Sequence, residues 1–266
     1  MKKPLPPFFI VGCARSGTTL LRDVLRLHPN LNAPEETFFY RWGHPFGTDA
    51  YKQIYIQNKT VRMHQTLDGL DSKRVKTLLS KSHSRREFNV RYTNSFLKQT
   101  KGQRWFDKTP QNIYGLLLLR AQFPTSPIVH IYRNPLNVVA SLMLGKVMPK
   151  QTLVAAVNYW LEAAQIINIY RSLPENNLLE LKYEDLLATP QAAIKQLLEA
   201  LGEDVKAFDF TQIVTEKSST TANHAIYIQA EDNKYLDVLS EKEVNYVCKQ
   251  CSHYMTHYGY GSALSD

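Results

Sequence analysis

The sequence predicts an α/β protein in three layers: a parallel sheet with helices on both of its faces. Short apolar runs alternate along the chain with longer segments whose apolar residues recur at helical spacing. Residues 8–22, FFIVGCARSGTTLLR, place an apolar strand, a turn of small residues and a helix start in direct succession. Because the 266 residues contain no linker or shift in composition, we expect a single domain over residues 1–266.

Local patterns justify the elements in chain order. Apolar runs predict strands at 8–12, 31–33, 103–107, 128–132 and 178–182. Helical spacing predicts helices at 18–28, 111–122, 135–146, 151–171, 190–201 and about 240–257. Pro110 and Pro135 stand at first helical positions behind plausible N-caps. Ser240 and Glu243 form a capping box that opens the last helix.

Residues 41–102 are less regular, with aromatic and basic residues and weak helical patterning. We expect a helical insertion over the edge of the sheet. Ligands of open α/β folds bind beyond the carboxyl ends of the strands, so this insertion is expected to shape a substrate pocket.

The turn after the first strand has the spacing of a phosphate-binding loop: Gly12, four residues, Gly17, then Thr18 and Thr19. Backbone N–H groups and a helix dipole converge at such a turn and favour an anion. A nucleotide-binding P-loop has lysine after its second glycine, whereas here Thr18 stands there and the nearby cation is Arg15. This substitution argues against an ordinary ATP or GTP enzyme. A turn that only connects a strand to a helix remains the alternative.

The loop resembles the 5′-phosphosulfate loop of sulfotransferases that use 3′-phosphoadenosine 5′-phosphosulfate (PAPS). The second half of that family's signature is also present, because residues 128–145, IVHIYRNPLNVVASLMLG, carry Arg133 and, eight residues later, Ser141. The resemblance covers nearly the whole chain and implies a P-loop NTPase-like fold, with Arg133 and Ser141 as ligands of the 3′-phosphate of PAPS. Some relatives have a further arginine four residues after the serine; here Gly145 stands there, and Lys146 is a substitute.

The rest of the donor site follows from the loop and from the resemblance. Arg15 is the expected ligand of the 5′-phosphosulfate, because a guanidinium can grip two oxygens at once. Tyr183, in the segment LLELKYEDLL, corresponds to a tyrosine that approaches the adenine in relatives. Ser218, Ser219 and Lys234 are candidates near the cofactor-closing loop. The loop residues expected to complete the cradle are Ser16, Gly17, Thr18 and Thr19.

A carboxylate is the expected proton acceptor. The pattern RSGTTLLR…HP…EET resembles protein-tyrosine sulfotransferases and related carboxylate-base enzymes, including bacterial ones, and the second glutamate of that pattern is Glu36. Adjacent residues of an extended segment point in opposite directions, so only one of Glu35 and Glu36 should face the loop. Cytosolic aryl and steroid sulfotransferases use a histidine instead; His44 and His83 are the substitutes available here.

Lys108 is the third expected catalytic residue, with Glu36 and Arg15. It lies in the segment WFDKTP, between a strand and a helix, and the family often has a similar segment. A lysine there can stabilise negative charge that develops during transfer. Asp107 either orients Lys108 or caps backbone N–H groups.

Charge and composition limit the partners. The formal net charge of +8 suits an anionic ligand, and no Lys/Arg run or aromatic–basic repeat indicates nucleic acid. The start, MKKPLPPFFIVG, fails as a signal peptide, and no stretch has the length of a transmembrane helix. We therefore expect a cytoplasmic protein without membrane contact, and the sequence leaves its oligomeric state open.

The pair Cys248-x-x-Cys251 is typical of metal or redox sites, but its surroundings favour a core position. It falls on one helix face with other apolar residues: Val244, Val247, Cys248, Cys251 and Met255. A zinc site needs a second ligand pair, and His257 alone does not supply one. We expect no metal site.

The predicted function is transfer of the sulfuryl group from PAPS to a hydroxyl or amine of an acceptor, most simply a small metabolite. Because the sulfuryl group carries less charge than a γ-phosphoryl group, a divalent metal is less necessary. A peptide tyrosine or a carbohydrate is the alternative acceptor. A P-loop kinase that uses ATP and magnesium, or a non-catalytic binding module with the same fold, is the alternative class.

Overall fold

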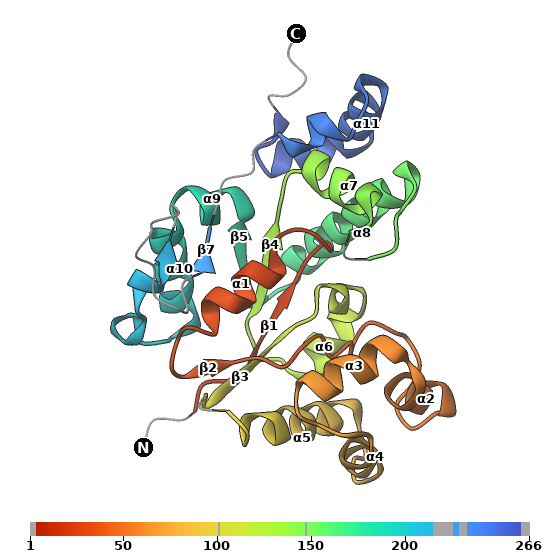
Figure 1. The fold of residues 1–266 in the computed structure, drawn as a ribbon, viewed down its shortest axis with the longest axis vertical. Coiled ribbons are helices and arrows are strands. Elements are labelled where there is room, and N and C mark those ends of the chain that lie inside the picture. The colour runs from red at the N-terminus through yellow and green to blue at the C-terminus, as the bar shows by residue number, and fades with distance from the viewer. Residues whose placement is uncertain (1–3, 101, 147, 215–225, 229–232, 262–266) are drawn as a thin grey trace.

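The computed structural model describes residues 4–100, 102–146, 148–214, 226–228 and 233–261. Within them, a five-stranded parallel sheet has the order β2-β3-β1-β4-β5, so that β1 lies at its centre (Figure 1). Phe9 of β1 pairs with Asp107 of β3 on one side and with Ile128 of β4 on the other. The strands are β1 (Phe8–Val11), β2 (Leu31–Asn32), β3 (Arg104–Lys108), β4 (Ile128–Tyr132) and β5 (Leu178–Lys182).

Helices occupy the predicted segments. They are α1 (Thr18–Leu25), α6 (Leu116–Gln122), α7 (Pro135–Leu144), α8 (Leu153–Ser172), α10 (Pro190–Leu201) and α11 (Glu241–His257). The segment predicted as one helix at 111–122 is divided, because a 3-10 helix, η1 (Pro110–Gly115), precedes α6. The predicted helix 135–146 ends early, because Gly145 adopts a left-handed φ of 67° and caps α7. The capping box of Ser240 and Glu243 at the start of α11 is confirmed.

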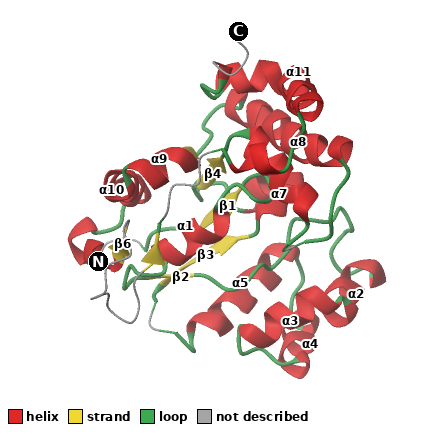
Figure 2. Ribbon diagram, turned by 45° about the horizontal axis from the view of Figure 1, so that its top comes forward, coloured by secondary structure: helices red, strands yellow, loops and turns green. Residues whose placement is uncertain are grey.

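The helices cover both faces of the sheet (Figure 2). Successive residues of a strand point to opposite faces. Phe8 and Ile10 accordingly join one core with α1 and α10, while Phe9 and Val11 join the other core with α7, α8 and α11. All residues of β1 are buried, which explains why the strand is apolar without alternation. The predicted three-layer α/β fold is confirmed.

Residues 41–102 contain four helices, which gather beside β3 in both views (Figures 1 and 2). Each begins with a side-chain N-cap, namely Thr48, Asn58, Asp71 and Ser84. Aromatic side chains from this region, including Tyr51, Tyr55 and Phe88, pack into the same core as Phe9. The helices are α2 (Asp49–Gln57), α3 (Lys59–Leu67), α4 (Ser72–Ser80) and α5 (Arg85–Leu97).

Several short elements have no counterpart in the sequence prediction. A short helix, α9 (Tyr183–Ala188), follows β5 directly, and a second parallel sheet consists of β6 (Ile213–Val214) and β7 (Ile226–Tyr227). Each is too short to give a full hydrophobic period. The further 3-10 helices are η2 (Val205–Ala207), η3 (Phe210–Gln212) and η4 (Lys234–Asp237).

The cysteine pair of α11 is part of the core, as predicted. Cys248 and Cys251 are fully buried and unbridged, beside Val247 and Met255. Burial raises the pKa of the Cys251 thiol to about 12, so this side chain is a thiol rather than a metal-binding thiolate. Among the residues described, none of the helices is both long and apolar enough to span a membrane.

Candidate active site

The loop between β1 and α1 is held in place by two glycines. A Cβ on Gly12 would lie 2.5 Å from the carbonyl oxygen of Ile131 in β4. Gly17 has a φ of 91° and caps α1, and a Cβ there would lie 2.2 Å from the ring of Tyr183. Both positions therefore require glycine. The turn directs the first N–H groups of α1, which have no intrahelical partner, toward one point.

Two arginines meet beside this loop. Arg15 has a left-handed φ of 74°, and its Nε donates to the Ser141 hydroxyl at 3.0 Å, across 126 residues of sequence. Arg133 donates to the backbone carbonyl of Arg15 at 3.4 Å, and its guanidinium lies 4.3 Å from the centroid of the Tyr183 ring. Burial, and then the charge of Arg133, lower the pKa of the Arg15 guanidinium. The tertiary structure thus joins the two halves of the sequence motif.

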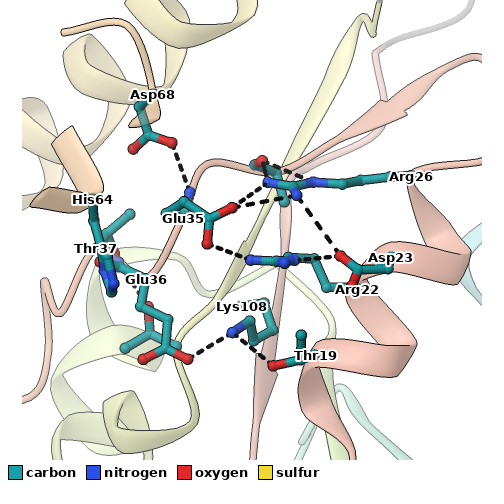
Figure 3. A network of polar contacts seen from close by, with 12 residues as sticks. Thr19, Arg22, Asp23, Arg26, Glu35, Glu36, Thr37, His64, Asp68 and Lys108 are labelled. Carbon is teal, nitrogen blue, oxygen red and sulfur yellow. Dashed lines mark hydrogen bonds and ion pairs between the residues drawn. The ribbon is translucent and has the colours of Figure 1, made fainter. Parts of the chain in front are cut away.

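Lys108 connects the loop to the segment after β2. It ends β3 next to Ile10 of β1, and only 2% of the residue is exposed. Its Nζ lies 2.6 Å from Oε1 of Glu36 and 3.4 Å from Oγ1 of Thr19 (Figure 3). Three sequence-predicted residues from three separate segments therefore form one cluster.

Glu35 lies in a different environment from Glu36. Its carboxylate contacts Arg22 at 2.6 Å and Arg26 at 3.4 Å, and its backbone N–H donates to Asp68 at 2.7 Å (Figure 3). Burial would raise the pKa of Glu35, but the two guanidinium groups outweigh it and hold that pKa below its ordinary value. Glu35 is thus neutralised by arginines of α1, while Glu36 is directed at Lys108.

Asp107 does not contact Lys108 through a hydrogen bond, although the sequence allowed that role. It is fully buried and accepts hydrogen bonds from the hydroxyls of Thr37 and Thr109. The Thr109 hydroxyl also accepts from the backbone N–H of Thr37 at 2.9 Å. Burial raises the pKa of Asp107 to about 6 despite these donors. Asp107 therefore ties the segment that carries Glu36 to the end of β3.

A cavity of about 690 Å³ opens beside this cluster. Arg15, Thr18, Thr19, Glu36 and Lys108 line its inner end. The side chains that line the rest are mainly apolar and aromatic: Phe38, Trp42, Met63, Met148 and Tyr159. The volume is within the ~300–1,000 Å³ typical of small-molecule sites.

His64 is a lining residue that the sequence analysis missed. Its Nδ1 lies 2.9 Å from the carbonyl oxygen of Glu36, and its ring stacks on Phe38. Because a carbonyl oxygen only accepts, Nδ1 donates this hydrogen bond. No spacing in the sequence connects α3 to Glu36, since only packing brings them together. His44 and His83, the predicted substitutes, are exposed and do not line the cavity.

Four other predicted residues lie away from this cluster. Ser16 is fully buried beside a small void lined by His130 and Trp160, so its side chain faces the core rather than the cavity. Lys146 is exposed just beyond α7. Lys234 opens η4, which contacts α7. Ser218 and Ser219 are outside the described residues.

A turn of this shape, between the central strand of a parallel sheet and the next helix, defines a P-loop-like α/β protein. Within that class the chain belongs to the sulfotransferase family, since the model of that family matches residues 6–207.

Relatives support this assignment at lower identity. The nodulation protein NoeE of Sinorhizobium fredii is 28% identical over 144 residues, which are 52% of this chain and 32% of NoeE, so the match spans about a third of that relative. The sulfotransferase domain from the curacin biosynthetic pathway matches with a TM-score of 0.58 and 19% identity, over 97% of this chain and 99% of that domain. The sulfotransferase domain of the Synechococcus PCC 7002 olefin synthase matches with a TM-score of 0.53 and 21% identity, over 77% and 75% of the two chains. These structures share the fold.

Proposed function

We propose that this protein transfers the sulfuryl group of PAPS to a hydroxyl or amine of an acceptor. The observation that carries the proposal is the meeting of Arg15 and Arg133 beside the loop. Within the described part of the chain, neither guanidinium forms an ion pair with a carboxylate. Two adjacent cations repel each other unless an anion lies between them, so the arrangement favours a ligand with several phosphate-type groups.

The residues present fit PAPS. The Nε of Arg133 is buried without a hydrogen-bond partner among the described residues, and a buried donor of that kind is costly unless a ligand satisfies it. On this proposal Arg15 and the backbone of residues 16–19 hold the 5′-phosphosulfate, while Arg133 and Ser141 hold the 3′-phosphate. Tyr183 contacts the adenine, and Ser218 and Ser219 remain candidates for closing the site.

The proposed chemistry assigns one role to each residue of the cluster. Glu36 accepts the proton of the acceptor's hydroxyl or amine as the oxygen or nitrogen attacks sulfur. The bond between sulfur and the bridging oxygen of PAPS breaks, and 3′-phosphoadenosine 5′-phosphate (PAP) leaves. Lys108 and Arg15 stabilise the negative charge that moves to the leaving phosphate. The closeness of Lys108 to both Glu36 and Thr19 supports this assignment.

The acceptor is proposed to be a small hydroxylated metabolite, with a peptide tyrosine or a carbohydrate as the alternative. The size of the cavity supports a small acceptor. Met63 and His64 of α3 line the cavity, which supports a pocket-forming role for the insertion 41–102 within one domain of residues 1–266. A cytoplasmic location and catalysis without a metal ion complete the proposal.

Transfer of radiolabel tests this function directly. The protein is incubated with [³⁵S]PAPS and a panel of phenols, alcohols, amines, sugars and a tyrosine peptide. In parallel, it is incubated with [γ-³²P]ATP, magnesium and the same panel. We expect ³⁵S in at least one product, no ³²P transfer, and loss of ³⁵S transfer in Glu36→Gln. Transfer of ³²P without transfer of ³⁵S would make the protein a kinase.

A further inference from the structure

An apolar groove of about 380 Å³ lies next to the cavity, between η1, α6 and α8. Its floor contains Ile113 and Leu116, each 1% exposed. Its rim carries Leu117, Leu118 and Ile169, with exposed fractions of 61%, 42% and 58%. Large aliphatic side chains gathered on a rim indicate a surface that binds something apolar, since such contact removes them from water.

The groove continues from the cavity. Trp42 lines both hollows. The 3-10 helix η1 runs along both as well, because Pro110 and Gln111 line the cavity while Ile113 and Tyr114 line the groove. A ligand that fills the cavity therefore reaches the groove by passing Trp42.

A polar group marks the junction between the two hollows. Arg41 donates to the side-chain oxygen of Gln111 at 3.1 Å, and its guanidinium lies 4.7 Å from the centroid of the Tyr114 ring. These contacts hold Arg41 at the wall of the groove. The path thus leads from the carboxylate of Glu36, past an aromatic ring and a cation, into a hydrocarbon surface.

We propose that the groove binds an apolar tail of the acceptor, so that the acceptor is an amphiphile with its nucleophilic hydroxyl at Glu36. This inference rests on the proposed function. The occupant is argued from the continuity of the groove with the cavity, which a tail attached to the acceptor exploits without a second binding event. Each methylene buried in the groove should strengthen binding by roughly two- to fourfold.

Binding of a 4-alkylphenol series tests the groove without turnover. Calorimetry on the protein saturated with PAP compares 4-ethylphenol, 4-butylphenol and 4-hexylphenol. We expect affinity to rise with each methylene in the wild type, and to lose this dependence in Ile169→Glu and Leu117→Glu. Val154→Glu is the matched control, since Val154 lies on the same helix as Ile169, is 55% exposed and is outside the groove.

The outcomes separate this inference from the proposed function. Affinity that does not depend on chain length, or that depends on it equally in all variants, overturns the groove even if ³⁵S is transferred to 4-ethylphenol. Length-dependent binding that Ile169→Glu abolishes, with no ³⁵S transfer to any phenol, supports the groove and counts against the proposed function. If Leu117→Glu instead converts a dimer to a monomer and leaves alkylphenol affinity unchanged, the groove is a contact between two copies and the proposal is wrong.

Discussion

Glu35 and Glu36 are neighbours in the chain with opposite partners. Arg22 and Arg26 of α1 surround Glu35, whereas Lys108 of β3 contacts Glu36. A carboxylate held between two guanidinium groups is a poor proton acceptor, because protonation would break both ion pairs. The different surroundings make the two residues a matched pair for mutation.

Glu36→Gln keeps the shape of the side chain and removes its proton acceptor. We expect kcat to fall by about 10²–10⁴-fold, with affinity for PAP nearly unchanged. Glu35→Gln should retain most of the activity. Steady-state kinetics at saturating PAPS decide between them. If Glu35→Gln is the inactive variant and Glu36→Gln is active, the base has been assigned one residue too late. If both are active, His64 is the next residue to test.

Arg133 should determine selectivity for the 3′-phosphate. A charge-assisted hydrogen bond contributes about 1.5–3 kcal/mol, so the protein should bind PAP roughly ten- to a hundredfold better than ADP or AMP. Arg133→Ala should remove most of that preference. Arg91→Ala is the control, since Arg91 forms a surface ion pair with Glu87. Calorimetry that finds equal affinities of the wild type for PAP and ADP would refute the assignment.

At the scale of elements, the turn before α1 depends on Gly17. Its φ of 91° and the Tyr183 ring 2.2 Å from a Cβ leave no room for a side chain. Strain of this kind costs about 1–3 kcal/mol, so Gly17→Ala should weaken PAP binding by roughly tenfold. Gly43→Ala is the control, because a Cβ there meets nothing within 4 Å. Unchanged PAP affinity of Gly17→Ala in calorimetry would show that the turn tolerates a Cβ.

The end of β3 should make stability depend on pH through Asp107. Its pKa of about 6 in the folded protein is above the ~3.9 of an unfolded chain. Between about pH 4 and 6 the folded state therefore keeps a proton that the unfolded state has released. The free energy of unfolding consequently falls as pH rises through that window.

Asp107→Asn removes this titration. The free energy of unfolding of the wild type minus that of the variant should decrease by about 3 kcal/mol from pH 4 to pH 7. Urea unfolding at a series of pH values measures the difference. Asp49→Asn is the control, since the Asp49 side chain is 90% exposed. A difference that stays constant across the series would exclude Asp107 as the titrating group.

At the scale of the molecule, the sheet brings Arg15, Lys108 and Arg133 from three loops to one end of the strands. These cations provide positive charge that many phosphoryl-transfer enzymes obtain from magnesium. We expect sulfuryl transfer to continue at an unchanged rate in EDTA. Initial rates measured with EDTA, and with added magnesium, test this. Loss of activity in EDTA and recovery with magnesium would indicate a metal-dependent reaction.

Most of the sheet could be predicted because its strands are buried on both faces. Such strands are continuous apolar runs, and all five agree with the predicted ranges to within one residue at either end. The short elements α9, β6 and β7 were missed because they do not complete a hydrophobic period. The helices of 41–102 have clear N-caps, but their aromatic residues pack on several sides and give only weak stripes.

The candidate site divides in the same way. The sequence by itself determined the glycine turn, the pairing of its motif with Arg133 and Ser141, and the order of the sheet's strands along the chain. Each of these depends on residues close in sequence, where backbone geometry and period are local. Only the tertiary structure decided that Glu36 rather than Glu35 contacts Lys108, that His64 lies beside it, and that a groove extends past Trp42. Those contacts join segments far apart in the chain, so they arise from how the helices pack on the sheet, which no local pattern encodes.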